Sequence, residues 1–191
     1  DVDGSGNVYV AGTSSATWGT PLRAFTASGS NADAFAAKLT GSGALTWNTF
    51  LGGVGSDGAR SINLDGAGNL DIAGFSSATW GAPVRAYAGS FDALAVQLSS
   101  SGALTWNSFF GSSGYEVAEG GALDASGNFY LSGYGDTTWG TPVQSYGGGT
   151  DDALAIKVGS NGTLAWNTFL GGSGQDIGEH IAVAGTSVFV T

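Results

Sequence analysis

The segment Asp3-Gly-Ser-Gly-Asn7-Val-Tyr-Val-Ala-Gly12 decides the fold, because the chain carries it three times. The second copy is Asp65-Gly-Ala-Gly-Asn69-Leu-Asp-Ile-Ala-Gly74, and the third is Asp124-Ala-Ser-Gly-Asn128-Phe-Tyr-Leu-Ser-Gly133. A spacing of about 60 residues between copies indicates a propeller, a solenoid or another repeat array. The repeat is therefore the unit in which the other residues are interpreted.

Two tryptophan motifs, Trp-Gly-x-Pro and Leu-x-Trp-Asn-x-Phe, keep the same period. The first motif holds Trp18, Trp80 and Trp139, and the second holds Trp47, Trp106 and Trp166. A fourth copy of the repeat begins at Ile181. We expect one repeat array over residues 1–191, with repeats at 3–64, 65–123 and 124–183 and a partial fourth at 184–191.

Within one repeat, short alternating apolar runs separated by Gly, Ser, Asp and Asn predict strands and turns. In the second repeat the expected strands are 60–64, 70–75, 92–98 and 103–110. Four antiparallel strands per repeat predict an all-β chain, a β-propeller with four-stranded blades of about 60 residues and about 3.5 blades. The alternative is a β-sandwich made of pseudo-repeats, which a fixed period of four strands makes the weaker interpretation.

Composition excludes several functions. The chain has 35 Gly among 191 residues, 15 Asp and Glu against 5 Lys and Arg, and neither Cys nor Met. The net charge of −10 disfavours nucleic acid and anionic membrane surfaces as partners, and no apolar run is long enough for membrane insertion. The lack of oxidisable Cys and Met and the small number of Lys suit an extracellular or cell-surface location.

The repeat resembles the prokaryotic SBBP-type β-propeller repeat family. Three patterns carry the resemblance: Asp-x-x-Gly-Asn-x-Tyr-x-x-Gly at 3–12, Asp-Ala-x-x-x-Lys-Leu at 33–39 and Phe-Leu-Gly-Gly-x-Gly-x-Asp at 50–57. It covers nearly the whole chain and implies a propeller in a secreted or surface-attached protein, usually without a known activity. The Trp-Gly-x-Pro loop departs from the family pattern.

The expected number of blades predicts association. Propellers close with roughly four to eight blades, and an unpartnered blade exposes an apolar face and open strand edges. We therefore expect self-association, as a homo-oligomer or a filament, or completion by the remainder of a longer chain.

Two sets of acidic residues are candidates for metal binding. Asp1, Asp3 and Ser5 resemble the start of a calcium loop, although a hairpin turn explains the same residues. Asp57, Glu116 and Asp176 recur at one position and would converge on the central channel of a closed ring, where they could bind a cation; the alternative is that each accepts N–H bonds of its own turn. Calcium is the only cofactor considered. Asp33, Asp92 and Asp152 also recur, which favours a role in local turns.

The tryptophans divide into a strand set and a loop set. Trp47, Trp106 and Trp166 are expected to pack between neighbouring blades. The loop residues Trp18, Trp80 and Trp139, with Tyr87 and Tyr146 nearby, could instead stack against sugar rings. The alternative is that each loop Trp closes one end of its blade.

Little in the sequence points to catalysis. His180 is the single His, and no nucleophile motif supports it. The expected function is a non-catalytic extracellular or cell-surface module with a structural, assembly or protein-interaction role. The alternative is a carbohydrate-binding module that uses the loop tryptophans.

Overall fold

The structure, a computed structural model, describes all 191 residues as thirteen β-strands and no helix. The first sheet consists of β1 (Val8–Ser14), β2 (Asp33–Leu39) and β3 (Leu45–Leu51). The second consists of β4 (Asp57–Leu64), β5 (Leu70–Ser76), β6 (Asp92–Leu98) and β7 (Leu104–Phe110). The third consists of β8 (Glu116–Leu123), β9 (Phe129–Gly135), β10 (Asp152–Val158) and β11 (Leu164–Leu170). A hairpin of β12 (Ile181–Ala184) and β13 (Ser187–Val190) follows.

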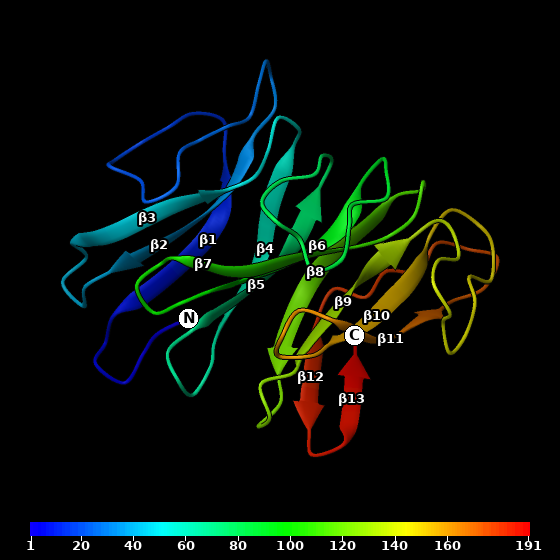
Figure 1. Cartoon of the computed structure of the whole chain (residues 1–191). Coiled ribbons are helices and arrows are strands. Elements are labelled where there is room, and N and C mark those ends of the chain that lie inside the picture. Colours follow the sequence, from blue (N-terminus) through cyan, green and yellow to red (C-terminus); the bar gives the residue numbers. More distant parts are fainter.

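The prediction of an all-β chain with antiparallel four-stranded sheets is confirmed. In every sheet the strands lie in chain order, and each pairs antiparallel with the next. The sheets follow one another along the molecule, and the terminal hairpin lies against β8 and β9 (Figure 1). No helix is present that could cross a membrane.

The repeated Asp-x-x-Gly-Asn segments form the turns that precede β1, β5 and β9. Their glycines Gly6, Gly68 and Gly127 have φ angles of 80°, 86° and 76°, a region that favours glycine because it has no Cβ. In the first turn, the Gly6 N–H donates to the Asp3 carbonyl at 2.9 Å. The recurrence of Gly in this segment therefore follows from its backbone conformation.

A β-bulge interrupts the first strand of both four-stranded sheets. In β4 the register of pairing shifts between Ala59 and Ser61, and in β8 it shifts at the equivalent place. Arg60 and Glu119 are therefore left out of the pairing between strands. The glycines opposite the bulges, Gly74 and Gly133, have no room for a Cβ because a backbone carbonyl of the bulged strand occupies that place. The bulges change the direction of the Arg60 and Glu119 side chains. These two side chains contact each other across the boundary between β4 and β8.

Two hydrophobic cores fill the spaces between successive sheets. Each sheet has a leading face and a trailing face, and the trailing face packs on the leading face of the next sheet. The leading residues are Leu70, Ile72, Leu94 and Leu98 in the second sheet, and Phe129, Leu131, Leu154 and Val158 in the third. The trailing residues include Ala34, Ala36 and Leu51 in the first sheet, and Ala93, Ala95 and Phe110 in the second.

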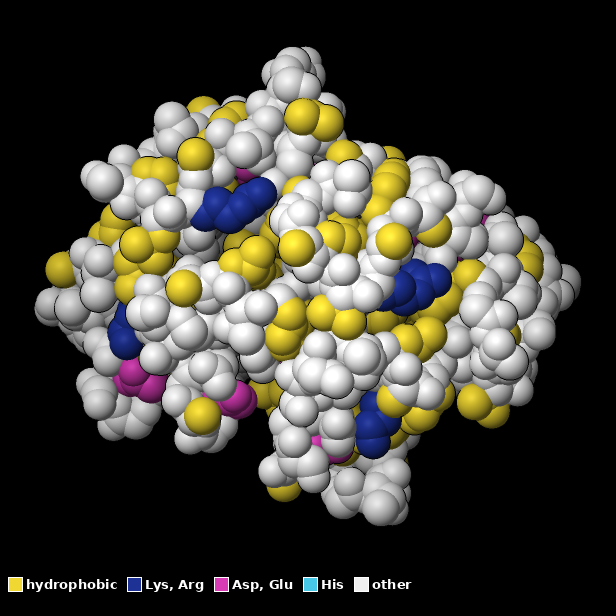
Figure 2. Space-filling model, in the orientation of Figure 1, with side chains coloured by type: hydrophobic (Ala, Val, Ile, Leu, Met, Phe, Trp, Pro, Cys, Tyr) yellow, Lys and Arg dark blue, Asp and Glu magenta, His cyan; other side chains and the backbone are white.

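The strand tryptophans join the trailing faces to the next sheet, as predicted for Trp47 and Trp106. The ring of Trp47 lies over Gly102, where a Cβ would be 2.9 Å from it, and Trp106 lies over Gly162 in the same way. Trp106 also donates its indole N–H to the Ser160 carbonyl at 3.1 Å. On the face shown in Figure 2, Lys and Arg side chains lie apart from one another among mostly hydrophobic and uncharged atoms, and one of them adjoins an acidic side chain.

Candidate functional site

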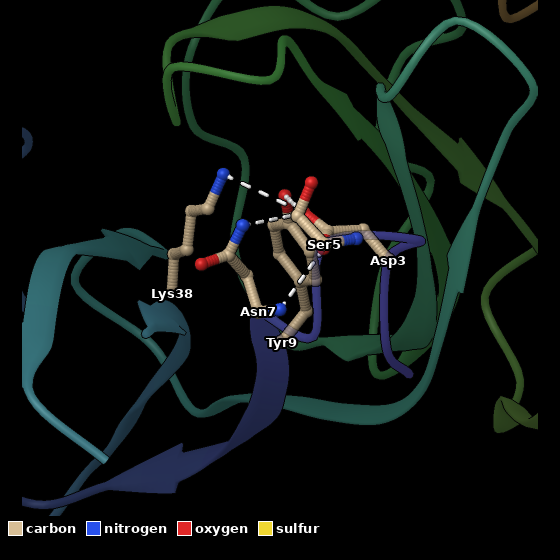
Figure 3. A network of polar contacts seen from close by, with 5 residues as sticks. All are labelled: Asp3, Ser5, Asn7, Tyr9 and Lys38. Atoms are coloured by element: carbon tan, nitrogen blue, oxygen red, sulfur yellow. Dashed lines mark hydrogen bonds and ion pairs between the residues drawn. The ribbon is translucent and has the colours of Figure 1, made fainter. Parts of the chain in front are cut away.

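The carboxylate of Asp3 organises the first repeated turn (Figure 3). Its Oδ1 accepts the backbone N–H groups of Ser5 and Asn7, both at 2.9 Å. Its Oδ2 accepts the Asn7 side-chain amide at 2.8 Å and the Tyr9 hydroxyl at 3.1 Å, and Lys38 Nζ lies 3.9 Å away. These bonds, led by that of the Asn7 side chain, lower the pKa of Asp3 to about 2.

The turn that was the alternative to a calcium loop at Asp1, Asp3 and Ser5 is present in the structure. The Asp1 carboxylate accepts the N–H groups of Val2 and Leu64, at 2.8 and 2.9 Å. Both carboxylates thus accept hydrogen bonds from N–H and O–H donors, and neither belongs to a group of three or more acidic or His side chains. The residues present do not fit a calcium ion, because it requires six to eight converging oxygens.

A pair of carboxyl groups encloses a glycine at each boundary between repeats. Asp33 and Asp57 are fully buried on either side of Gly52. A Cβ on Gly52 would lie 2.5 Å from Asp33 Oδ1 and 2.7 Å from Asp57 Oδ2, so only glycine fits. The other pairs are Asp92 with Glu116 around Gly111, and Asp152 with Asp176 around Gly171.

One carboxylate of each pair has an oxygen without a hydrogen-bond partner: Oδ1 of Asp33, of Asp92 and of Asp152. The second oxygen accepts a backbone N–H, as Asp33 Oδ2 does from Thr26 at 2.7 Å. Burial raises the pKa of Asp57 and of Asp92 to about 6, and that of Glu116 to about 7. The nearby carboxylate adds to this shift at Asp57 and Glu116.

The predicted ring of Asp57, Glu116 and Asp176 is not formed. Each of these residues belongs to a different pair, and no three Asp, Glu or His side chains come close enough to hold a metal ion. The alternative agrees with the structure, because these three carboxylates accept backbone N–H groups of their own turns at 2.9, 2.9 and 3.1 Å.

The loop tryptophans do not form an exposed surface on which sugar rings could stack. Trp80 and Trp139 are only 5% and 4% exposed, so their ring faces are not available to a ligand. Trp18 is half-buried and lies edge-on against Phe35 and Phe50. For Trp80 and Trp139 the structure agrees with the alternative, in which each ring closes an end of its repeat.

The two tyrosines predicted to accompany the loop tryptophans are half-buried. The Tyr87 hydroxyl donates to the carbonyls of Ser77 and Ser90, at 2.9 and 2.7 Å. The Tyr146 hydroxyl donates to the Gly149 carbonyl at 2.8 Å. Both hydroxyls therefore hold their own loops.

A row of four aromatic rings, here called the aromatic ladder, was not anticipated from the sequence. It consists of Phe75, Phe91, Tyr115 and Tyr134, with ring centroids 5.7, 4.8 and 6.2 Å apart in that order. Tyr115 is 37% exposed, and the other three are half-buried. The ladder crosses from the second sheet to the third, where Phe91 and Tyr115 form a parallel bridge.

A pocket of about 470 Å³ adjoins the last ring of the ladder. Its lining is Glu119, Tyr134, Ile177, Glu179 and His180. The bulge residues meet here, since Arg60 Nε lies 3.4 Å from Glu119 Oε2. The Arg60 guanidinium also lies 5.1 Å from the ring centroid of Phe75, which connects the pocket to the first ring of the ladder.

One sequence signal could have identified these residues. Phe91, Tyr115 and His180 stand at positions where the other repeats have different residue types, whereas the fold depends on residues that recur. Such departures mark the two central rings of the ladder and one residue of the pocket. No family model matches this chain, and no curated protein shows significant similarity to it.

Proposed function

We propose that this chain is a non-catalytic β-propeller repeat module with a structural and assembly role, outside the cell or at its surface. Two observations support a propeller-like arrangement of about 3.5 blades. The trailing face of each sheet packs on the leading face of the next, and the strand β8 contacts both β4 and β12, the first strands of their own repeats. The scarcity of charge and the absence of Cys and Met suit exposure to oxidants and proteases.

One observation carries the assembly role: on each of the two end faces, an apolar residue is exposed although its counterpart at an internal boundary is buried. On the leading face of the first sheet, Val10 is 38% exposed, whereas its counterpart Ile72 is 1% exposed. On the trailing face of the third sheet, Leu170 is 41% exposed, whereas Phe110 is fully buried. The two faces are only partly uncovered, since Phe50 on the first stays buried and the terminal hairpin contacts the third sheet at β8 and β9. They are of the kinds that pack together twice within the chain.

We propose that a second copy of the chain covers these faces, trailing face on leading face. Such contact is head-to-tail, so it closes into a ring or continues as a filament. Light scattering of the chain at increasing concentration tests this proposal. A mass of two or more chains supports it, and loss of that mass in Val10→Arg, but not in a Val54→Arg control on an exposed loop, identifies the face. A monomer at every concentration would overturn it.

Carbohydrate binding is the alternative function. The burial of Trp80 and Trp139 leaves it without support at the predicted loops. The exposed ring of Tyr115 belongs instead to the aromatic ladder, which lies outside the loop motif.

A further inference from the structure

The aromatic ladder and the pocket beside it form a binding surface that the assembly role does not use. We propose that Phe75, Phe91, Tyr115 and Tyr134, together with Glu119, Glu179 and His180, bind a neutral oligosaccharide. This proposal goes beyond the assembly role and does not depend on it. It places carbohydrate recognition at the boundary of the second and third sheets.

The fold does not require the central rings of the ladder. The backbone around Phe91 and Tyr115 has the same arrangement in all three repeats: the Glu116 N–H donates to the Phe91 carbonyl at 2.8 Å, and equivalent bonds of 2.7 and 2.8 Å occur in the others. The equivalent residues are Ala32 with Ser56 and Asp151 with Gln175. The equivalent contacts in the other two repeats therefore form without aromatic rings. We infer that Phe91 and Tyr115, at the boundary of the second and third sheets, have another role.

The four rings form a continuous row, of which Tyr115 is exposed and the other three are half-buried. Successive ring centroids are 4.8 to 6.2 Å apart, within the range of direct ring contact. The row ends at Tyr134, whose ring also lines the pocket. Neighbouring rings are inclined to one another by 57°, 44° and 18° along the row, so successive rings can contact the apolar C–H groups of different sugar units.

The polar groups beside the rings select against charged ligands. Arg60 already occupies the position that a cation would take, since it lies over Phe75 and contacts Glu119. Anions are repelled by Glu119 and Glu179, in a chain of net charge −10. The remaining groups include donors, such as the Tyr134 hydroxyl, and carboxylate acceptors. Sugar hydroxyls, which donate and accept, complement such a mixture.

Calorimetric titration with four neutral hexaoses (cellohexaose, laminarihexaose, mannohexaose and chitohexaose) tests the proposal. We expect at least one to bind the unmodified chain. We expect Phe91→Ala and Tyr115→Ser to weaken that binding by about tenfold each, as lost ring contacts do. Both substitutions install the residue found at the equivalent position of the first repeat, so the free energy of unfolding should change little.

The matched control is Trp18→Phe, which changes a half-buried ring away from the ladder and should bind as the unmodified chain does. Failure of all four hexaoses to bind would overturn the proposal. Binding that survives both ladder substitutions, or that is lost only in Trp18→Phe, would also overturn it. The mass measured by light scattering is independent of these titrations, so the failure of one proposal leaves the other intact.

Discussion

The guanidinium of Arg85 lies 5.0 Å from the ring centroid of Trp139, across the boundary between the second and third repeats. It also donates to the carbonyls of Phe109 and Gly111, at 2.6 and 3.1 Å. Arg23 repeats the arrangement on Trp80 at 4.9 Å. In each case one arginine side chain connects the end of a sheet to the loop of the next repeat. In the third repeat the position of Arg23 and Arg85 is occupied by Gln144.

Replacing Arg85 tests whether this contact stabilises the boundary. Arg85→Gln installs the residue of the third repeat but removes the cation–π contact and at least one hydrogen bond to a buried carbonyl. We expect a loss of about 1–3 kcal/mol in the free energy of unfolding, measured with urea. Arg60→Gln, at an exposed ion pair, should cost less than about 1 kcal/mol. Equal losses in the two variants would contradict the interpretation.

The carboxyl pairs predict that Gly52 cannot be replaced. In Gly52→Ala the new methyl group would meet Asp33 and Asp57 at 2.5 and 2.7 Å, and we expect a loss of about 1–3 kcal/mol from overpacking. Gly172→Ala is the control, because nothing lies within 4 Å of that position. Urea unfolding measures the free energy of unfolding of both variants. Equal values in Gly52→Ala and Gly172→Ala would contradict the prediction, because Asp33 and Asp57 would then move aside at little cost.

The buried carboxyls predict that stability falls as pH rises. The pKa values of Asp57, Asp92 and Glu116 are raised by burial to about 6, 6 and 7, whereas these groups titrate near 4 in the unfolded chain. Between these values the folded state binds more protons than the unfolded state, so the free energy of unfolding decreases with pH. We expect a decrease of about 2 kcal/mol or more between pH 5 and pH 8.

Urea unfolding at the two pH values measures this decrease. Glu116→Gln keeps the shape of the side chain but cannot ionise, so the decrease should be smaller in that variant. If the free energy of unfolding increased over this range, or if Glu116→Gln left the decrease unchanged, the buried pairs would not be its cause.

The loop tryptophans should matter for stability in proportion to their burial. Trp139→Ala removes a ring that is 4% exposed and should cost about 3–5 kcal/mol. Trp18→Ala removes a half-buried ring and should cost less. Thermal or urea unfolding of both variants measures the order, and the reverse order would contradict the assignment of Trp139 as a core residue.

The sequence predicted the features that depend on local, recurring signals. Alternation in segments such as 92–98 identified strands, and Asp-x-x-Gly-Asn identified the turns with positive φ at Gly6 and its counterparts. The prediction of Asp3 as a turn residue also agrees with the structure, because the hydrogen-bond partners of its carboxylate lie within six residues of it along the chain.

Features that depend on packing between sheets could not be predicted in this way. The bulge at Arg60 has no sequence signature, yet it leaves Arg60 out of the strand pairing, where its side chain contacts Glu119. Phe91 and Tyr115 are 24 residues apart in the sequence and become neighbours only when β6 and β8 meet at the boundary. The acidic pairs were missed for the same reason, since Asp33 and Asp57 lie on different sheets.

Mixing two variants tests the central claim, head-to-tail pairing of a trailing face with a leading face, most directly. Val10→Arg blocks the leading face and Leu170→Arg blocks the trailing face, so each alone should be monomeric by light scattering. Mixed in equal amounts, each variant supplies the intact face that the other lacks, and the account predicts a heterodimer. A mixture that stays monomeric, or single variants that still assemble, would contradict it.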